Sequence, residues 1–330
     1  MAIRKNAAFG FVDFALKDLG SARTTATLGR LDAATPWERL AHPIRQLPEY
    51  KPHGAGRPPW EPALMLKCLM LAKWYHLSDP QLEDHLRDRI SFRKFVGLSF
   101  DDRTPDETTF VTFRKRLREA KLDEYLFGSV TKHLEAQGFL VREGTMVDAT
   151  IIEQATGSKN DDGQNTRDTD ASFTKKHGKT YHGYKAHIAC DLSGIVTDYR
   201  FTTAKEHDSK RIDELTEDED KAVLADSAYA SQARREALQV RGVIDAIIYK
   251  RNRGQPRLAD WQEEWNGIVS RVRAHVEHPF AMMKQQLGYR KVRYRGLERN
   301  AFDACLTLMA CNLKRSLWLR SVDPVPKNAG

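Results

Sequence analysis

The chain has 330 residues, enough for two domains with ordinary cores. Its 53 Lys and Arg against 45 Asp and Glu give a formal charge of +8 and a pI of about 9.2, and such a basic surface favours nucleic acid or anionic membranes as partners. No apolar run approaches the ~20 residues of a membrane span, and Asp13, Lys17 and Asp18 interrupt the segment where a signal peptide needs an apolar core. Composition therefore excludes an integral membrane protein and argues against secretion.

Cysteine usage agrees with this prediction. The four cysteines are scattered and form no Cys-x-x-Cys pair: Cys68, Cys190, Cys305 and Cys311. This disfavours a structural zinc site and a disulfide framework, so we expect a protein of the reducing cytoplasm.

The first third of the chain has helical patterning. Residues 58–77 are an apolar helical stretch introduced by proline. Ser78 as cap and Pro80 in the first turn predict that the next helix opens there and runs to about residue 98. Its apolar positions share one face: Leu82, Leu86 and Ile90.

Residues 103–122 carry a capping box with Thr104 as the cap, Pro105 at the first helical position and Glu107 reaching back. This helix is expected to bury three apolar side chains, Phe110, Phe113 and Leu117, and to carry four basic ones elsewhere: Arg114, Lys115, Arg116 and Arg118. Short helices with a basic helix among them are compatible with a helix-turn-helix DNA binder. A helical packing module with a solvated charged face explains the same pattern equally well.

After residue 140 the pattern changes to strands. Residues 144–150 predict a short strand, and the polar segment 156–179 has little to bury, so we expect it to be a loop or disordered. Residues 181–191 and 194–204 predict an antiparallel hairpin that turns at 192–194.

Helices and strands then alternate to the C-terminus. The predicted elements are a helix over 208–218, a strand over 222–229, a helix over 231–242, a strand over 243–251, a long helix over about 259–288 and a last helix over 301–320. Three meandering strands followed by strands linked through helices are typical of a ribonuclease H-like α/β domain. The predicted fold is therefore this core, a mixed sheet flanked by helices, with an N-terminal all-helical domain.

Two of these strands end at an acid. Asp148 and Asp226 each follow a short apolar strand, the position at which functional groups gather in α/β sheets. If the strands are neighbours, the two carboxylates repel each other, and a divalent cation relieves the repulsion. Acids also end strands because they favour turns, and either aspartate alone is explained in that way.

A third acid lies in a basic helix. Arg273, Glu277 and Lys284 stand at positions i, i+4 and i+11, which place all three on one face of a regular helix. One interpretation is a surface ion pair between Arg273 and Glu277, worth only ~0.3–0.5 kcal/mol. The other is that Glu277 completes a three-carboxylate site while its basic neighbours hold phosphates.

Three carboxylates suit Mg²⁺, for which Mn²⁺ can substitute. Two such ions ~3.5–4 Å apart can activate a water or a 3′-hydroxyl and stabilise the leaving oxygen of a phosphodiester. A zinc site built from histidines is a weaker alternative, because His275 and His278 do not form the His-Glu-x-x-His motif of zinc hydrolases. We expect these two, with His182, His187 and His207, to orient acids or contact the backbone.

At this point five ordered blocks resemble a known family. They are VDATIIEQATGSKN, YHGYKAHIACD, TTAKEHDS, LADSAYAS and VEHPFAMMKQQLGYRKVRYRGLERN, and the stretch from Asp79 to Leu117 is similar to the family's N-terminal domain. Together they resemble bacterial insertion-sequence transposases of the DDE type, in the group numbered five, close to the IS-four-like superfamily. The resemblance covers most of the chain and implies a ribonuclease H-like core.

The resemblance assigns the acids one by one. It implies that Asp148, Asp226 and Glu277 are the catalytic and metal-binding carboxylates. The family signature places tyrosine, arginine, glutamate and lysine along one helix; Arg273, Glu277 and Lys284 fit it, but Ser270 stands at the tyrosine position. That difference concerns one phosphate or base contact and not the metal site.

The domains expected from this are a helical N-terminal domain over 1–140 that binds terminal repeats, a catalytic domain over 141–320 and a tail over 321–330. The gap between Asp226 and Glu277 is short, so no large inserted β domain is expected there.

A basic, tyrosine-containing run follows Glu277. Its cations would neutralise phosphates and its tyrosines could stack on an unpaired base. The predicted DNA contacts are Arg273, Lys284, Tyr289, Arg290, Lys291, Arg293, Tyr294 and Arg295, with Lys185 and the segment 174–176 supported more weakly. The alternative is a solvated loop whose tyrosines pack on the core.

The leading hypothesis is a transposase that binds the inverted repeats of an insertion sequence, cleaves DNA at the element ends and joins the 3′-hydroxyl ends to a target with Mg²⁺. It would work in the bacterial cytoplasm near the nucleoid, on double-stranded DNA and as a homodimer, because two ends must be brought together. The alternatives are a ribonuclease H-like nuclease without strand transfer and a DNA-binding protein whose acids are structural or inactive.

Overall fold

The structure is a computed structural model that describes residues 23–51, 58–155, 157, 166–176, 178–251 and 254–322. The charged N-terminal segment 13–18 and nearly all of the predicted tail 321–330 lie outside these residues. The chain forms two compact units, one of residues 1–133 with 313–330 and the other of residues 134–312.

The first unit is helical. Its elements are α2 (Arg23–Ala34), α3 (Trp37–Arg45), the 3₁₀ turn η2 (Pro48–Tyr50), α4 (Pro62–Trp74), α5 (Asp79–Asp88), α6 (Ile90–Val96), α7 (Glu107–Glu119) and most of α8 (Asp123–Ala136), and it also takes in the last turns of α13 (Leu297–Val322). Helix α4 is apolar all round, so 12 of its 13 residues are buried. It is the central helix of this unit's core.

Two details of the N-terminal helices differ from the prediction. Ser78 does cap α5 in a capping box with Gln81, but the predicted helix over 78–98 breaks at Arg89, whose backbone is extended. As a result Leu82 and Leu86 are fully buried, whereas Ile90 is 36% exposed. After the break, α6 turns a different set of side chains to the core, Phe92, Phe95 and Val96.

The cap predicted for α7 was also wrong. Asp106, and not Thr104, accepts the hydrogen bond from the backbone N–H of Thr109, at 2.7 Å. The predicted apolar face is correct, since Phe110, Phe113 and Leu117 are all buried. An aspartate closer to the helix satisfies the free N–H groups of the first turn directly.

The second unit is built on a mixed sheet. Its strands are β1 (Thr145–Glu153), β2 (Ser172–Lys176), β3 (Lys179–Cys190), β4 (Val196–Thr203), β5 (Ala222–Ala225) and β6 (Ile244–Ile247), in the order β2-β3-β1-β5-β6 with β4 also paired to β3. The β3–β4 hairpin and β1–β3 are antiparallel, whereas β1–β5 and β5–β6 are parallel. This confirms the predicted ribonuclease H-like core.

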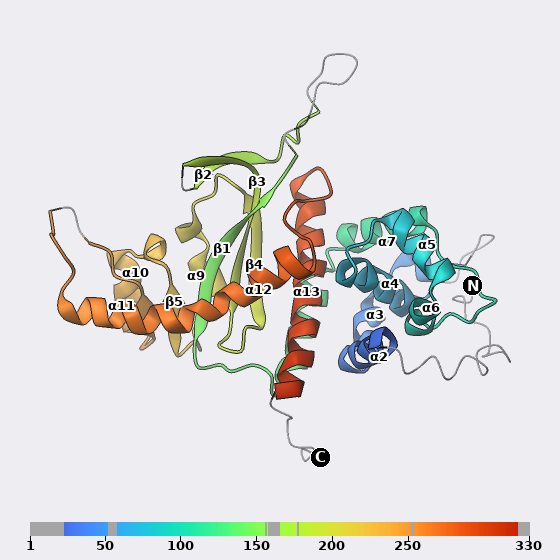
Figure 1. Cartoon of the computed structure of the whole chain (residues 1–330), viewed down its shortest axis with the longest axis horizontal. Coiled ribbons are helices and arrows are strands. Elements are labelled where there is room, and N and C mark those ends of the chain that lie inside the picture. The colour runs from blue at the N-terminus through green and yellow to red at the C-terminus, as the bar shows by residue number, and fades with distance from the viewer. Residues whose placement is uncertain are drawn as a thin grey trace. The chain divides into compact units, whose positions relative to one another are not determined.

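The helical elements of this unit follow the expected order with changed lengths. They are η3 (Asp208–Lys210), α9 (Ile212–Leu215), η4 (Ser227–Tyr229), α10 (Gln232–Val240), α11 (Asp260–Arg273), η5 (Ala274–Val276), α12 (Glu277–Ala281), η6 (Met282–Gln286) and α13. Between Asp226 and Glu277 the described residues hold only η4, α10, β6, α11 and η5, so no inserted β domain lies among them. Figure 1 shows α11 and α12 passing across the sheet near β1 and β5.

The polar segment 156–179 was expected to hold no regular structure, yet its second half forms strand β2. Residues Ser172–Lys176 pair with Lys179–Gly183 of β3. The sequence did not predict this strand, because its side chains are mostly polar and exposed. An edge strand with both faces near solvent lacks the apolar alternation that marks a strand.

The long helix predicted over 259–288 is interrupted. The α-helical turns stop at Arg273, continue as the 3₁₀ turn η5, resume as α12 and end as the π-helical turn η6. Pro279 has no N–H to bond to the carbonyl of His275, and its ring crowds that carbonyl, which accounts for the altered turn before it. The side chains of Arg273, Glu277 and Lys284 therefore do not follow the angles of one regular helix.

None of the helices in the described part of the chain is both long and apolar enough to cross a membrane. All four cysteines are buried.

Candidate functional site

The sheet brings the first two acids together. Strands β1 and β5 are parallel neighbours, with Met146 opposite Leu224 and Val147 opposite Ala225. Asp148 is the next residue of β1 and Asp226 is the first residue after β5, so the two acids follow at the same level of the sheet. The predicted strand end at Asp148 is wrong, because β1 continues to Glu153. Both carboxylates are partly exposed there.

Asp226 is held by the turn that it starts. Its carboxylate accepts a hydrogen bond from the backbone N–H of Ser227, and its carbonyl accepts one from the N–H of Tyr229 at 2.9 Å. Strand β5 ends at Ala225 and η4 begins at Ser227. The aspartate is thus a strand end and a helix cap at once, as short polar residues at such turns commonly are.

Asp148 is paired with Arg273. A guanidinium nitrogen of Arg273 donates to Oδ2 of Asp148 at 3.0 Å, and each of the two side chains is 21% exposed. The other oxygen, Oδ1, accepts from the N–H of Ala149 at 2.7 Å. Arg273 therefore contacts Asp148 from β1 rather than Glu277 on its own helical stretch, so the surface ion pair considered from the sequence is not the contact that forms.

Glu277 lies within electrostatic reach of this pair. Burial raises the pKa of Asp148 above its usual range, and the negative charge of Glu277 raises it further, while the N–H of Ala149 and the charge of Arg273 act in the opposite direction. Two acids whose charges act on each other favour either a proton or a cation near them. Glu277 is itself exposed on the first turn of α12.

The three acids fit a divalent cation by their chemistry, because carboxylate oxygens are the ligands that Mg²⁺ and Mn²⁺ prefer. They are not a finished site: among the described residues, no group of three His, Cys, Asp or Glu side chains is arranged to hold a metal ion as it stands. Arg273 supplies the positive charge beside Asp148 in this arrangement. Metal binding therefore requires the side chains of Asp148 and Glu277 to turn toward each other.

The raised pKa of Asp148 predicts that its ionisation lowers the free energy of unfolding in a pH-dependent way. An acid whose pKa rises on folding holds its proton more tightly in the folded chain, so its ionisation lowers the free energy of unfolding above that raised pKa and has no effect well below its ordinary value of 3.8. We expect metal-free Asp148→Asn to melt above the wild type at pH 7, with the gain disappearing toward pH 3.5. Thermal melts across this pH range check it; an equal or lower melting temperature for the variant at pH 7 contradicts it.

Three cations lie beside the acids. Burial lowers the pKa of Lys284, and the charges of Lys176 and Arg290 lower it further, while Glu153 and Glu277 partly oppose them. Lys176 ends β2 and is exposed, as is Arg290. A cluster of like charges at the edge of an acidic site suits a polyanion that runs past it.

The basic segment after η6 is attached to the end of β1. The N–H of Glu153 donates to the carbonyl of Arg290 at 3.0 Å, and the N–H of Val292 donates to the carbonyl of Glu153 at 2.9 Å. This bridge holds Lys291 next to the sheet with its side chain exposed, and the side chains of Arg293 and Arg295 are exposed beyond it.

One predicted contact in this segment is wrong. Tyr289 is only 3% exposed and its hydroxyl donates to the carbonyl of Asn300 at 3.3 Å, so its ring belongs to the core and offers no face to a base. The alternative, that the tyrosines pack on the core, describes this residue. Tyr294 is partly exposed and stays a predicted contact.

Lys185 lies on the opposite face of the sheet from Asp148. It pairs with Ile151, and side chains alternate along β1, so Lys185 shares its face with His187. Its ammonium group donates to the carbonyl of Glu206 and to the carboxylate of Asp208, both at 2.8 Å. With these partners and 12% exposure, Lys185 supports the loop after β4.

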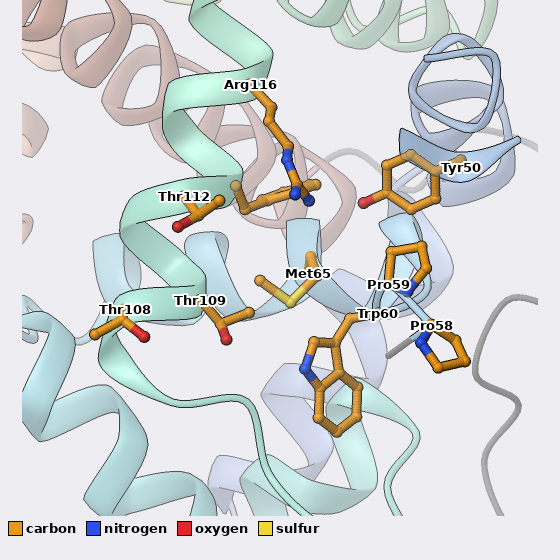
Figure 2. A pocket seen from close by; sticks show the side chains of 10 residues that line it. Tyr50, Pro58, Pro59, Trp60, Met65, Thr108, Thr109, Thr112 and Arg116 are labelled. Carbon is orange, nitrogen blue, oxygen red and sulfur yellow. The ribbon is translucent and has the colours of Figure 1, made fainter. Parts of the chain in front are cut away.

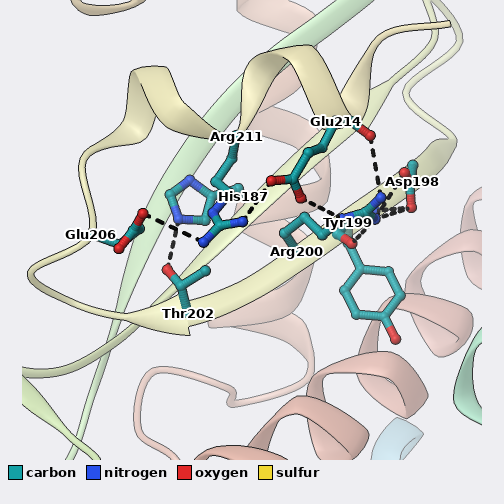
Figure 3. Close-up of polar contacts among 8 residues, drawn as sticks. All are labelled: His187, Asp198, Tyr199, Arg200, Thr202, Glu206, Arg211 and Glu214. Carbon is teal, nitrogen blue, oxygen red and sulfur yellow. Dashed lines mark hydrogen bonds and ion pairs between the residues drawn. The ribbon is translucent and has the colours of Figure 1, made fainter. Parts of the chain in front are cut away.

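The same face carries a polar network around His187 (Figure 3). His187 is fully buried, its Nε2 lies 2.9 Å from the hydroxyl of Thr202, and burial lowers its pKa to about 4. Arg211 and Arg200 both reach Glu214 nearby. This histidine is neutral and structural, and its bonded partner is a threonine hydroxyl, so the predicted role of orienting an acid or contacting the backbone is wrong for it.

The N-terminal unit has a separate pocket of about 200 Å³ (Figure 2). Tyr50, Trp60 and Met65 form one side of it, and Arg116 with three threonines of α7 forms another: Thr108, Thr109 and Thr112. Helix α7 was predicted to carry a basic face, but one of its basic residues lies inside the fold. Arg114 is buried and forms a two-bond ion pair with Asp79. Arg116 lies 3.7 Å from Glu49.

One side chain near the acids was not predicted from the sequence: Tyr229 lies in the LADSAYAS block without a predicted role. Lys176 was a weakly supported DNA contact, but the strand that carries it was not predicted. The available sequence signal for Tyr229 is a large aromatic residue three positions after an acid that follows a predicted strand.

Comparison with known proteins follows this geometry. Residues 140–313, more than half of the chain, match the family described as "Transposase DDE domain", and residues 17–116 match "Transposase domain (DUF772)". Among solved structures, the chain is similar to the "Crystal structure of the Mos1 Strand Transfer Complex" at 14% identity, over 84% of this chain and 82% of that chain, with a TM-score of 0.25. The chain therefore belongs to the DDE transposases, enzymes that cleave DNA and transfer its strands with divalent metal ions.

Proposed function

We propose that this transposase binds the terminal inverted repeats of an insertion sequence, cleaves DNA at the element ends and joins the freed 3′-hydroxyls to target DNA. The observation that supports this is the parallel pairing of β1 with β5, which delivers Asp148 and Asp226 at one level of the sheet with Glu277 within reach. Within the DDE transposases we assign the chain to insertion-sequence family five, because its sequence blocks resemble those of that family in the same order.

In this proposal Asp148, Asp226 and Glu277 hold two Mg²⁺ ions, for which Mn²⁺ can substitute. The ions, when bound, activate the attacking oxygen and stabilise the leaving one. The chain's own part is positional: the turn at Ser227 fixes Asp226, the N–H of Ala149 fixes one oxygen of Asp148, and Arg273 holds the other. Arg273, which lies beside Asp148, would be placed to contact a DNA phosphate at this site.

The DNA backbone would run along the cations beside the acids. Lys284 and Arg290 are predicted contacts, and Lys176 belongs to the segment 174–176 that the sequence supported more weakly. Lys291, Arg293, Tyr294 and Arg295 would extend the path on the exposed side of the bridge to Glu153. Ser270 is exposed one turn before Arg273 and leaves the family's tyrosine contact unfilled.

The N-terminal helical domain would recognise the terminal repeats, and residues 141–320 would carry the chemistry. We further propose a homodimer on DNA, because two element ends must meet, and a place of action in the bacterial cytoplasm, at the nucleoid.

The test is a joining reaction. The protein is incubated with Mg²⁺, a precleaved duplex carrying the inverted repeat that flanks its gene, and a supercoiled plasmid. We expect end DNA covalently joined to the plasmid. Cleavage of uncut ends without any joining would instead identify a nuclease, and DNA binding without either reaction would identify an inactive binding protein.

The cation cluster predicts the salt dependence of binding. Each phosphate contact that is lost reduces the slope of log affinity against log salt by about 0.9. We expect Lys284→Ala and Lys176→Ala each to lower this slope by about one unit, measured by fluorescence anisotropy with end DNA over a range of salt concentrations.

Lys221→Ala is the matched control. Lys221 immediately precedes β5, at the end of the strand away from Asp226, and its ammonium group is bound to Glu143 at 2.7 Å. Its replacement should leave the slope unchanged. An equal loss in all three variants would show that the cluster has no special role.

A further inference from the structure

Tyr229 is a buried side chain with an unused donor. It is 1% exposed, and its hydroxyl has no hydrogen-bond partner among the described residues. Buried polar groups are bonded in the great majority of cases, so an exception indicates a partner in another state of the molecule. In this chain the exception lies beside the proposed metal site.

The position of Tyr229 follows from Asp226. The acid ends β5, the turn η4 follows, and the N–H of Tyr229 bonds back to the carbonyl of Asp226 at 2.9 Å. The ring then packs in the core cluster that contains Val147 and Ala225, the two residues that directly precede the acids. The ring therefore packs against the end of β5 and the part of β1 that precedes Asp148.

Acids surround the hydroxyl. A phenol donates one hydrogen bond, and the acids whose charges act on it are Asp148, Asp208 and Asp226. Both oxygens of Asp148 are bonded, one to Ala149 and one to Arg273, whereas Asp208 is bonded to Lys185 through one oxygen. Asp226 is the acid to which Tyr229 is also joined through the backbone. Asp226 has one oxygen bonded to Ser227 and, in the described part of the chain, a second oxygen without a donor.

We infer that Tyr229 is a positioning residue, whose hydroxyl donates to the carboxylate of Asp226 when that carboxylate binds a divalent cation. This rests on the proposed metal site. A ligating carboxylate uses one lone pair for the metal and leaves others free, and a neighbouring donor that occupies one of these fixes the direction of the ligating oxygen.

The test compares two tyrosine-to-phenylalanine variants of the full chain. Tyr229→Phe removes a hydroxyl that is unbonded here, so the metal-free protein should melt at or above the wild-type temperature. Its affinity for Mn²⁺, measured by the electron paramagnetic resonance signal of the free ion, should fall about 10-fold or more. The Mn²⁺ concentration for half-maximal cleavage should rise with it.

Tyr184→Phe is the matched control. Tyr184 is equally buried, but its hydroxyl donates to Asp168 at 2.7 Å. This variant should melt lower and bind Mn²⁺ as the wild type does. The two variants thus separate a loss of stability from a loss of metal affinity.

Three results would overturn the inference. Wild-type Mn²⁺ affinity in Tyr229→Phe would show that the hydroxyl does not act on the metal ligands, and a lower melting temperature of that variant with unchanged affinity would show a structural bond, for example to Asp208. If the wild type shows no Mn²⁺ binding that is lost in Asp226→Asn, the metal site itself is refuted, and the role of Tyr229 with it.

Discussion

Asp226→Asn and Glu277→Gln should each reduce metal-dependent cleavage of end DNA by about 10³-fold or more while DNA binding persists. The metal ions contribute several kcal/mol of transition-state stabilisation, and each 1.4 kcal/mol corresponds to a factor of ten in rate. Asparagine can still accept the hydrogen bond from Ser227 that Asp226 accepts, and Glu277 is exposed, so neither change disturbs the fold. Gel-based cleavage and mobility-shift assays with the same duplex measure both quantities.

Glu264→Gln is the matched control, because Glu264 is an exposed acid of α11, the helix that precedes the Glu277 turn. It should cleave like the wild type. Full cleavage by Asp226→Asn or Glu277→Gln would remove the site assignment. Loss of binding together with cleavage would instead show that these acids support the fold of the DNA-binding surface.

Most of the sheet and the position of one acid were predictable from the sequence. A short apolar strand followed by an acid is a local pattern, and it placed Asp226 correctly just after β5, whereas Asp148 lies inside β1, which continues to Glu153. Their adjacency depends on the pairing of β1 with β5, which local patterns do not contain. The sequence left open whether the two strands are neighbours, and the register shows that they are.

The details that the sequence did not predict depend on tertiary contacts. The helix around Glu277 was expected to be regular, but Pro279 and the π-helical turn η6 change its geometry, and Arg273 turned out to face Asp148. Tyr289 was assigned to DNA because it lies among cations, whereas burial places it in the core. Charge and spacing identified the region of the site correctly; which side chain faces in or out is decided by packing.

Lys185 shows the same limit on the other face of the sheet. Its position in a block shared with the family made a DNA contact plausible, but the alternation of β3 turns it away from Asp148 and toward Asp208. Lys185 pairs with Ile151, an odd number of residues from Asp148, and this puts it on the other face. Such a register is known only once the strands are paired.

Gly183→Ala should destabilise the protein by about 3 kcal/mol or more, the upper range for forcing extra atoms into a packed site. Gly183 lies in β3 between Glu153 of β1 and Ser172 of β2. A Cβ atom there would collide with the carbonyl oxygen of Ile152 and lie 2.9 Å from the backbone nitrogen of Gln154. Both are backbone atoms of the sheet, so no side-chain rotation can relieve the contact.

The damage should extend to function, because Glu153 anchors the basic segment through its bonds to Arg290 and Val292. We expect a lower melting temperature and weaker binding of end DNA at a temperature where the variant is still folded. Gly267→Ala is the control: Gly267 lies in α11 with no atom within 4 Å of a built Cβ, so alanine there should stabilise the helix by about 0.5–1 kcal/mol. If Gly183→Ala melts like the wild type, strands β1 and β3 do not approach as closely as their register requires, and the bridge that carries Lys291 loses its support.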